Sequence, residues 1–174
     1  SVYEFGCGTG HNLFRIGEVN PTAEIYGLDW ARSSQETISI INEKFGKTFR
    51  SQQFNFFDVD KKYSLEAGAG VFTFAALEQS GDNYQEFIKY LISQNPSICL
   101  HVEPISELLD PARNLLDSLS VEYFRKRNYL SGFLNFLKAQ EAEGKLEIIN
   151  AQRSQIGSLF IDGYSIVVWR PTNA

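Results

Sequence analysis

The residues that could do chemistry begin with a glycine-rich turn near the start of the chain. The sequence from Glu4 to Gly10 reads EFGCGTG, with glycines at three alternate positions and a carboxylate two residues before the first of them. Because glycine carries no side chain, such a turn lets a ligand lie against backbone N–H groups at the start of a helix. The G-x-G-x-G spacing departs from the G-x-G-x-x-G of dinucleotide sites, since His11 follows the last glycine. The acid at Glu4 suits a cationic ligand better than a pyrophosphate.

A second candidate for chemistry lies in the sequence LHVEP. His101 and Glu103 alternate along a predicted strand and therefore share one face of it. An imidazole held by a carboxylate can act as a general base, which makes Glu103 and His101 the candidate catalytic residues. The alternative is a single buried histidine that is satisfied by a neighbouring backbone group. A metal ion needs more ligands than this pair offers, so we predict no metal site.

Three further groups could contact a substrate. Glu78 and Gln79 follow a predicted strand of the sheet. The cations at 125–127 could hold a phosphate or carboxylate, or could form a solvated helical face with aromatic residues packed behind it. Phe160 and Tyr164, near the last turn, could line an acceptor pocket or belong to the core.

Strands and helices alternate along most of the chain, and they must position these groups. The predicted strands of this part are Val2–Phe5, Ala23–Leu28, Phe49–Phe57, Val71–Ala76 and Ile98–Glu103. The signals for the starts of its helices are His11, the capping-box spacing from Ser33 to Glu36, Asn83 with Glu86, and the pair Asp110–Pro111. A further helical pattern stops at Gly144. Two adjacent strands follow, whose short link implies an antiparallel hairpin: Leu146–Ala151 and Tyr164–Trp169.

This order of elements predicts a doubly wound α/β architecture, with a mostly parallel sheet and a C-terminal antiparallel hairpin. Such sheets bind ligands at the carboxyl ends of their strands. Asp29 and Asp58 directly follow the second and third predicted strands. Two acids therefore join the glycine turn at that edge of the sheet.

The bulk properties exclude several classes of protein. The chain has 174 residues, of which 43% are hydrophobic and 21% charged, as is typical of one folded domain with a sizeable core. Its net charge of -5 argues against a nucleic-acid partner, because phosphate binding needs clustered Lys and Arg. No apolar run approaches the roughly 20 residues that cross a bilayer, so we expect no membrane partner.

The cysteines and the first residue bear on where and how the chain works. Cys7 and Cys99 lie in or beside predicted central strands, and they indicate buried, reduced thiols in a cytoplasmic protein. Ser1 falls almost directly on the first strand. We therefore expect residues 1–174 to be a domain excised from a longer polypeptide, with neighbouring domains as further partners.

Several ordered motifs point to one known family. EFGCGTG resembles the first motif of class I S-adenosylmethionine-dependent methyltransferases, [D/E]-x-G-x-G-x-G, at every fixed position. Asp29 and Asp58 match the family's acids at the ends of its second and third strands. The segment FTFAALEQ is similar to the family's fourth-strand segment, which often ends L-E-H, although Gln79 stands in place of the histidine. The resemblance covers nearly the whole chain, including the final hairpin.

The resemblance implies S-adenosylmethionine as cofactor. In the family, the acid at Asp29 bonds both ribose hydroxyls, the residue at Trp30 often lies on the adenine ring, and the acid at Asp58 faces the adenine amino group. The implied cofactor-binding residues are Glu4, Gly6, Cys7, Gly8, Thr9, Gly10, Asp29, Trp30, Asp58, Val59 and Ala75. Two alternatives stay open: Trp30 as packing against a helix, and Asp58 as a plain turn residue. Cys7 occupies a variable position of the turn and is not a nucleophile.

The resemblance further implies an enzyme that transfers a methyl group to a small-molecule acceptor, most plausibly to a hydroxyl of a sugar or natural product. Methyl transfer from a sulfonium is an in-line displacement, so alignment by itself can suffice and a base is optional. The fourth-strand end lacks the N-P-P-Y sequence of many relatives that methylate amino groups. The lid helices that usually precede the first motif are absent from this sequence.

Two other functions remain alternatives. The first is a non-catalytic module that binds S-adenosylmethionine or a protein partner on the same fold. The second is a nucleotide-dependent oxidoreductase, which the glycine spacing disfavours.

Overall fold

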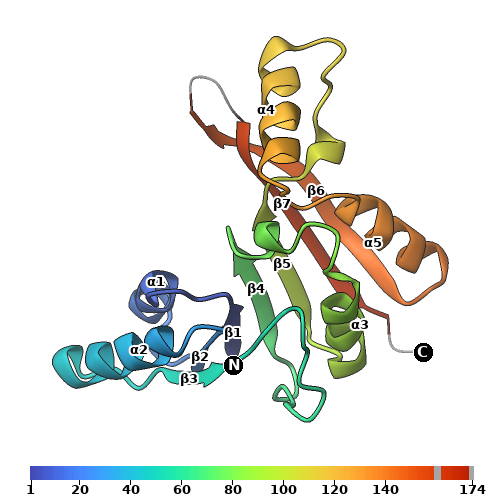
Figure 1. Ribbon diagram of the computed structural model, residues 1–174. Coiled ribbons are helices and arrows are strands. Elements are labelled where there is room, and N and C mark those ends of the chain that lie inside the picture. The colour runs from blue at the N-terminus through green and yellow to red at the C-terminus, as the bar shows by residue number, and fades with distance from the viewer. Residues whose placement is uncertain (159–161, 173–174) are drawn as a thin grey trace.

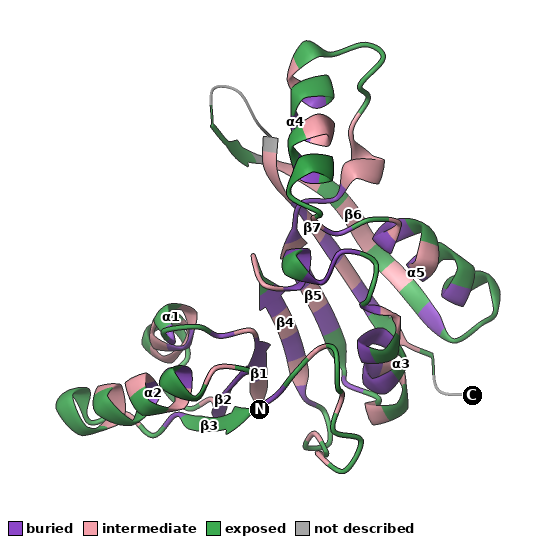
Figure 2. Ribbon diagram, in the orientation of Figure 1, coloured by how far each residue is buried: buried purple, intermediate pink, exposed green. Residues whose placement is uncertain are grey.

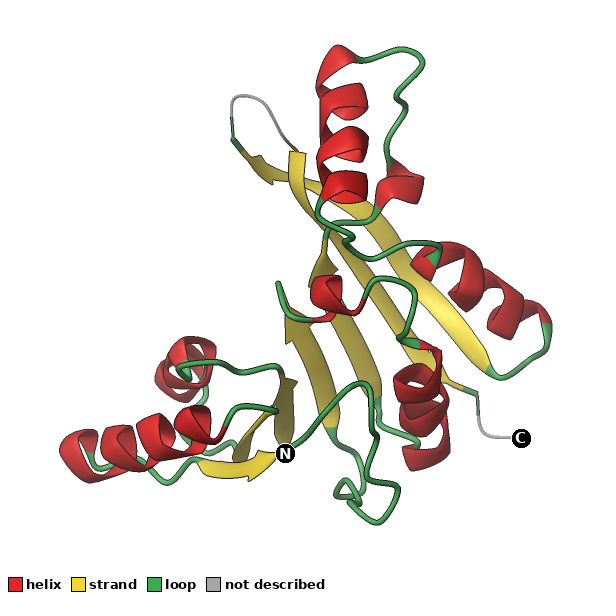
Figure 3. Ribbon diagram, viewed as in Figure 1, coloured by secondary structure: helices red, strands yellow, loops and turns green. Residues whose placement is uncertain are grey.

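The computed structural model describes residues 1–158 and 162–172. Its centre is a seven-stranded sheet with the order β3-β2-β1-β4-β5-β7-β6 (Figures 1 and 3). The strands are β1 (Val2–Phe5), β2 (Ile25–Asp29), β3 (Arg50–Gln53), β4 (Gly70–Phe74), β5 (Ile98–Glu103), β6 (Leu146–Gly157) and β7 (Asp162–Pro171). The first five strands pair in parallel, whereas β7 runs antiparallel to both β5 and β6. The predicted doubly wound sheet with an antiparallel C-terminal hairpin is confirmed.

Helices cover both faces of this sheet. They are α1 (His11–Val19), α2 (Arg32–Phe45), α3 (Gln85–Gln94), α4 (Leu115–Lys126) and α5 (Phe133–Ala142), with the 3-10 helices η1 (Leu77–Ser80) and η2 (Ser106–Leu108). Figure 1 shows α1 and α2 grouped beside β2 and β3, and α4 beside the far end of the β6–β7 hairpin. Among the described helices, none is long and apolar enough to cross a membrane.

Two hydrophobic clusters hold the layers together. A small one joins α1 and α2 to β2 through Leu13, Ile38 and Ile25. A larger one lies on the other face of the sheet, where α3 and α5 pack against the central strands. Phe5 at the end of β1 belongs to it, with its ring centroid 5.0 Å from that of Phe87. Figure 2 shows that the central strands are largely buried and that the outer surfaces of the helices are exposed.

The third strand is shorter than the sequence pattern predicts. β3 ends at Gln53, and residues 55–58 form a turn closed by an isolated bridge between Asn55 and Asp58. The physical reason is aromatic packing. The ring of Phe54 lies 4.7 Å from that of Phe5, and the ring of Phe56 lies 4.8 Å from that of Phe87. These contacts take the chain out of the edge of the sheet and into the core.

Two predicted helix starts are wrong. α2 begins at Arg32 after an extended Ala31, so Ser33 lies inside the helix and forms no capping box. The start is set earlier, because the Asp29 carboxylate accepts the N–H of Ala31 at 2.9 Å. α4 begins after Asn114, whose side-chain oxygen accepts the N–H of Leu116 at 2.9 Å. The pair predicted to start that helix, at 110–111, instead begins the turn before it.

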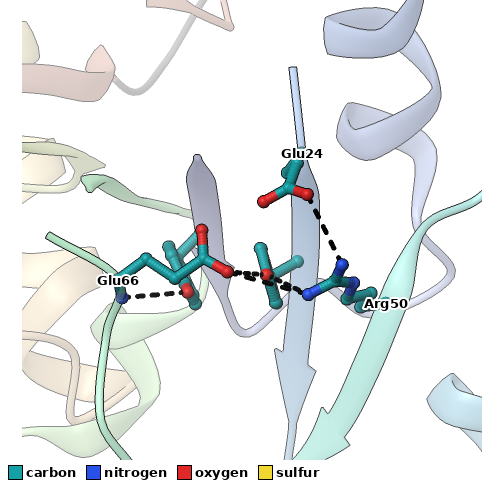
Figure 4. Close-up of polar contacts among 5 residues, drawn as sticks. Glu24, Arg50 and Glu66 are labelled. Atoms are coloured by element: carbon teal, nitrogen blue, oxygen red, sulfur yellow. Dashed lines mark hydrogen bonds and ion pairs between the residues drawn. The ribbon is translucent and has the colours of Figure 1, made fainter. Parts of the chain in front are cut away.

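A polar network ties the long loop before β4 to the starts of β2 and β3 (Figure 4). Arg50 lies 3.4 Å from a carboxylate oxygen of Glu24 and 3.7 Å from one of Glu66. The Tyr26 hydroxyl accepts a hydrogen bond from Arg50 and donates one to Glu66. The loop amide of Glu66 donates to the Tyr3 hydroxyl at 3.2 Å. The Tyr26 hydroxyl is therefore the shared centre of the network.

Removing that hydroxyl is expected to cost stability without affecting a ligand site. Tyr26→Phe should lower the free energy of unfolding by about 1 kcal/mol, because two charge-assisted hydrogen bonds lose their common partner. Urea denaturation would measure the change. Glu24→Gln is the matched control, since it weakens only an exposed ion pair worth roughly 0.5 kcal/mol or less. Equal effects of the two substitutions would contradict the central place of the Tyr26 hydroxyl.

Candidate functional site

The glycine turn has the backbone conformation that its sequence predicts. Gly6, Gly8 and Gly10 have φ angles of 80°, 51° and 77°, in the left-handed region that favours glycine. A Cβ on Gly6 would lie 2.3 Å from the Cβ of Ala76, so the turn packs directly against the segment after β4. A Cβ on Gly8 would meet no atom within 4 Å. The turn is thus closed at Gly6 and open at Gly8.

Gly8 opens into a cavity of about 540 Å³ at the carboxyl ends of β1, β2 and β4. Three segments line this cofactor-sized space: the glycine turn with the end of β2, the turn after β3, and the segment after β4. The lining residues are Gly6, Gly8, Asp29, Trp30, Phe54, Asn55, Phe56, Phe57, Ala75, Ala76, Gln79 and Ser80. We call this space the first cavity.

Asp29 joins the glycine turn to the second strand. One oxygen of its carboxylate accepts the N–H of Gly8 at 2.8 Å, and the other accepts the N–H of Ala31 at 2.9 Å. The side chain is largely buried but still lines the first cavity. A carboxylate oxygen can accept more than one hydrogen bond, so Asp29 keeps acceptor capacity toward a ligand.

Trp30 stands at the rim of the first cavity. The residue is 70% exposed, which does not match the alternative that it packs against a helix. Its backbone is held in place, because the carbonyl accepts a hydrogen bond from the Gln53 side chain at 2.8 Å. An exposed, anchored indole beside a cavity offers a flat surface for a ligand ring.

Glu4 lies behind the turn as a buried acid. Asn12 donates to one of its oxygens at 2.7 Å, and the other oxygen has no partner among the described residues. Burial raises the pKa of Glu4 to about 7; the hydrogen bond from Asn12 opposes this rise and the negative charge of Asp29 adds to it. A cation bound nearby would favour the charged form of this carboxyl.

Several of the residues predicted to bind the cofactor do not line the first cavity. The Cys7 thiol belongs to the small hydrophobic cluster, and burial raises its pKa to about 12, followed by the charges of Glu4 and Asp29. Thr9 is exposed, and Gly10 forms the start of α1. These three residues line no part of the cavity wall, so any contact of theirs with a ligand stays a prediction.

The structure brings Ala75 to the first cavity but not Asp58 or Val59. Ala75 lines the cavity with a φ angle of 50°, which is uncommon for a residue with a side chain. Asp58 is exposed at the end of the turn after β3, and Val59 packs against the larger hydrophobic cluster. The contact of Asp58 with the adenine amino group and the role of Val59 in cofactor binding remain predictions.

Part of the cavity wall consists of residues that the sequence motifs do not predict for the site. The unassigned residues are Phe54, Asn55, Phe56, Phe57, Ala76 and Ser80. The signal for the first four is the sequence FNFF at 54–57, whose aromatic pattern also predicts a strand. Aromatic residues just past a strand end can line a ligand site as readily as they extend the strand.

His101 lies in the core and away from the first cavity. Its Nδ1 is 3.0 Å from the Thr73 hydroxyl, and its ring lies between those of Phe133 and Trp169 at centroid distances of 5.2 and 6.1 Å. Full burial lowers the pKa of His101 to about 3, so the ring is neutral. The partner is a hydroxyl, where the alternative reading of a buried histidine expected a backbone group.

Glu103 shares the buried face of β5 with His101, as alternation predicts, and it is fully buried. Its carboxylate accepts the N–H groups of Ala76, Leu77 and Glu78 at 3.2, 3.1 and 3.0 Å. Burial raises the pKa of Glu103 to about 7, while hydrogen bonds from the Thr73 hydroxyl and these amides oppose the rise. Neither predicted catalytic residue lines the first cavity, and a role as general base stays a prediction without support from this geometry.

A second cavity of about 420 Å³ adjoins the segment after β4. Its wall contains Glu78, Pro104, Tyr123, Phe124, Tyr129, Ile156, Gly157, Ser158, Gly163 and Tyr164. Glu78 is 8% exposed, and burial raises its pKa against the opposing effects of the Tyr129 hydroxyl and the Arg127 charge. Gln79, the next residue, lines the first cavity. Two neighbouring residues of η1 thus face two different cavities.

The other predicted substrate contacts divide between the cavities and the solvent. Tyr164 lines the second cavity, and Phe160 lies outside the described residues. Arg127 lines a polar cavity of about 510 Å³ next to Glu78, and its guanidinium carbon lies 5.7 Å from the centre of the Tyr129 ring. Arg125 instead pairs with Glu122 at 2.7 Å on the exposed surface of α4.

Within residues 1–158 and 162–172, no three His, Cys, Asp or Glu side chains are grouped as a metal site requires.

Solved structures identify the fold that carries these cavities. An O-methyltransferase from neocarzinostatin biosynthesis, solved with S-adenosylmethionine and 2-hydroxy-5-methyl naphthoic acid, matches 98% of this chain with a TM-score of 0.66 and 18% identity. The mitomycin 7-O-methyltransferase matches 98% with a TM-score of 0.67 and 14% identity. This chain has the class I methyltransferase fold. The methyltransferase domain of bacterial CtHen1-C shares it, with 98% of this chain and 88% of that chain matched, a TM-score of 0.63 and 20% identity.

The solved structures match this chain by fold and not by close sequence similarity, since their identities are 12–20%. No protein-family model and no curated protein sequence matches the chain. The chain spans about half of the length of the first two enzymes, since it covers 48% of each. A further structure with this fold, matched over 98% of this chain at a TM-score of 0.66 and 12% identity, is described as a pericyclic reaction enzyme. The fold therefore serves more than one chemistry, and the site must decide the function.

Proposed function

We propose that the chain binds S-adenosylmethionine in the first cavity and transfers its methyl group to a hydroxyl of a small molecule held in the second. The observation that carries this proposal is the hydrogen bond from the Gly8 amide to Asp29 at 2.8 Å. It joins an open glycine turn to an acid at the end of the neighbouring strand, next to an exposed indole. These three features are the ones that a ligand with an amino-acid end, a ribose and a purine requires.

Each part of the first cavity suits one part of this cofactor. Gly8 leaves room for the methionine end beside backbone N–H groups, and Asp29 offers acceptors to the ribose hydroxyls. The rings of Trp30 and Phe57 at the rim can stack on the adenine. The buried acid Glu4 favours a positive charge nearby, and the ligand carries a sulfonium and an ammonium group.

The bound cofactor would supply a methyl group on a positively charged sulfur. The acceptor oxygen would form its bond to this carbon from the side opposite to the sulfur, the S–C bond would break to leave neutral S-adenosylhomocysteine, and the hydroxyl proton would pass to solvent. The work of the protein is then to align the acceptor and to exclude water. We place the acceptor in the second cavity because Glu78 in its wall and Gln79 in the wall of the first cavity are adjacent residues of η1. Its aromatic wall with one buried acid, Glu78, suits a small ring compound with a hydroxyl, of the sugar or natural-product type. The naphthoic acid bound by the neocarzinostatin enzyme belongs to this class of compound.

Calorimetric titration with S-adenosylmethionine, S-adenosylhomocysteine and NADH tests the cofactor. We expect saturable binding of the first two and none of NADH; binding of NADH by itself would favour the oxidoreductase. Production of S-adenosylhomocysteine with a panel of phenols, sugars and amines then tests the acceptor. Binding without turnover on any hydroxyl compound would favour the non-catalytic module.

The indole at the rim gives a sharp test of the adenine position. Trp30→Ala is expected to weaken S-adenosylhomocysteine binding by about tenfold, because ring stacking contributes roughly 0.5–1.5 kcal/mol. The melting temperature should not change, since the residue is 70% exposed. Phe45→Ala is a suitable control, because this aromatic residue is also exposed but lies on α2 outside the cavity wall. Unchanged affinity of the Trp30 variant would exclude stacking on this ring.

A further inference from the structure

The chain makes an unusual turn where β4 ends. Ala75 follows the strand with a φ angle of 50°, although it is not a glycine. Its N–H still donates to the Val102 carbonyl of β5 at 3.0 Å, so the chain leaves the sheet only after this residue. η1 then begins at Leu77. A left-handed alanine persists only where the surrounding structure holds it in place.

One carboxylate holds this turn. Glu103, at the end of β5, accepts the N–H groups of three successive residues: Ala76, Leu77 and Glu78. Both carboxylate oxygens take part, and the side chain has no exposed surface. These amides precede or begin a 3-10 helix, where intrahelical acceptors are lacking. Without Glu103, they would be donors with no partner in the core.

The segment that Glu103 holds forms part of the wall of both cavities. Ala75, Ala76 and Gln79 line the first cavity, whereas Glu78 lines the second. The same segment touches the glycine turn, since Ala76 lies against Gly6. A shift of this segment would therefore have two effects at once. It would change the shape of the first cavity, and it would move Glu78, the buried acid of the second.

We infer that Glu103 is a positioning residue: its carboxylate holds in place residues 75–80, which contribute to the walls of both the first and the second cavity. This inference rests on the proposed function for the identity of the ligands, but not for the contacts. It gives Glu103 a task other than proton abstraction. A general base must reach the acceptor, whereas this carboxylate has both oxygens directed to backbone amides.

Thr73 and His101 extend the same arrangement into the sheet. The two residues are register partners on β4 and β5. The Thr73 hydroxyl lies 3.0 Å from Nδ1 of His101, and it also opposes the rise in the pKa of Glu103. The neutral ring of His101 is fixed by its two aromatic neighbours. The Thr73 hydroxyl is therefore a further polar group, besides the three amides, that favours the charged form of the Glu103 carboxylate.

The test compares Glu103→Gln with Glu107→Gln. Glu107 is a matched control, because its carboxylate accepts the N–H of Leu134 at 2.9 Å at the start of α5, yet it lines neither cavity. We expect Glu103→Gln to weaken S-adenosylhomocysteine binding by about tenfold or more, because the glutamine side chain has one acceptor oxygen where the carboxylate uses two, and its NH2 group would face a backbone N–H. The amide NMR signals of residues 76–78 should move in the protein without ligand. Glu107→Gln should move the Leu134 signal and keep the affinity of the wild type.

The outcomes separate the two proposals. Wild-type affinity in Glu103→Gln, or unmoved signals at residues 76–78, would overturn the positioning role. Loss of turnover with unchanged affinity would instead make Glu103 a base. If the wild type binds no S-adenosylhomocysteine, the proposed function fails, and the amide signals still decide the role of Glu103. Should Glu103→Gln not fold, Thr73→Val removes one supporting hydroxyl at constant shape; it should move the same signals and weaken binding, and a wild-type result in both measurements would overturn the inference.

Discussion

Replacing Gly8 by arginine is expected to abolish binding of S-adenosylmethionine and S-adenosylhomocysteine while the chain stays folded. A Cβ at this position meets no atom within 4 Å, and the residue lines the first cavity. The long side chain would therefore occupy the space of the ligand without a clash in the core. The φ angle of 51° adds backbone strain of about 1–2 kcal/mol, which a domain with typical stability tolerates.

Gly46→Arg is the matched control for this prediction. Gly46 also has a left-handed φ angle, of 62°, and open space around its Cβ position, but it lies at the end of α2. Both variants should lose similar stability in thermal denaturation, and only the Gly8 variant should lose at least about 100-fold in affinity by calorimetry. If the Gly8 variant binds as the wild type does, the cofactor lies elsewhere. If both variants lose binding, strain is the cause and occupation of the cavity is not.

The second large effect is expected for Asp29→Ala. The carboxylate orders the glycine turn through Gly8 and the start of α2 through Ala31. In the proposed complex it also accepts hydrogen bonds from the two ribose hydroxyls. Hydrogen bonds to a charged group contribute roughly 1.5–3 kcal/mol each, so affinity for S-adenosylhomocysteine should fall by about 100-fold or more.

Asp60→Ala provides the comparison, because the Asp60 side chain accepts the N–H of Lys62 at 2.9 Å in the same local pattern but on the surface. In calorimetry, the Asp60→Ala variant should bind S-adenosylhomocysteine with the affinity of the wild type. The affinity for methionine, which lacks the ribose and the adenine, is a second readout by calorimetry, since the ribose contacts do not contribute to it. A loss smaller than tenfold in Asp29→Ala would contradict a direct contact with the ribose.

The roles proposed for Glu103 and His101 differ from those that the LHVEP sequence suggests. Local spacing favours a base at the end of β5, whereas the structure directs Glu103 to the backbone of the β4 turn and keeps His101 neutral. A methyl transfer driven by alignment is compatible with this arrangement, because the cofactor itself provides the electrophile. Glu78, with its raised pKa, is the carboxylic acid in the wall of the second cavity, where the proposed acceptor would bind.

The sequence by itself determined the features that depend on short-range spacing. The glycine turn, the acid at Asp29 and the alternation of strands and helices follow from backbone sterics and hydrophobic periodicity. Each of these signals is contained in a short stretch of sequence, so it can be recognised without knowledge of the residue's tertiary partners. The class of fold was therefore predictable. Gly6, Gly8, Asp29, Trp30 and Ala75 were implied by the resemblance to class I methyltransferases, and all five line the first cavity.

Only the tertiary structure decided which side chains face a cavity and which are used inside the core. The Glu103 carboxylate is bound by amides 25 to 27 residues away in the sequence. Phe54 leaves the third strand because its ring packs against that of Phe5. The second cavity is assembled from η1, α4 and the β6–β7 hairpin, which are distant in sequence. Periodicity reports that a residue is buried or exposed on average. It does not report the partner, and the partner determines whether an acid binds a ligand, a proton or the backbone.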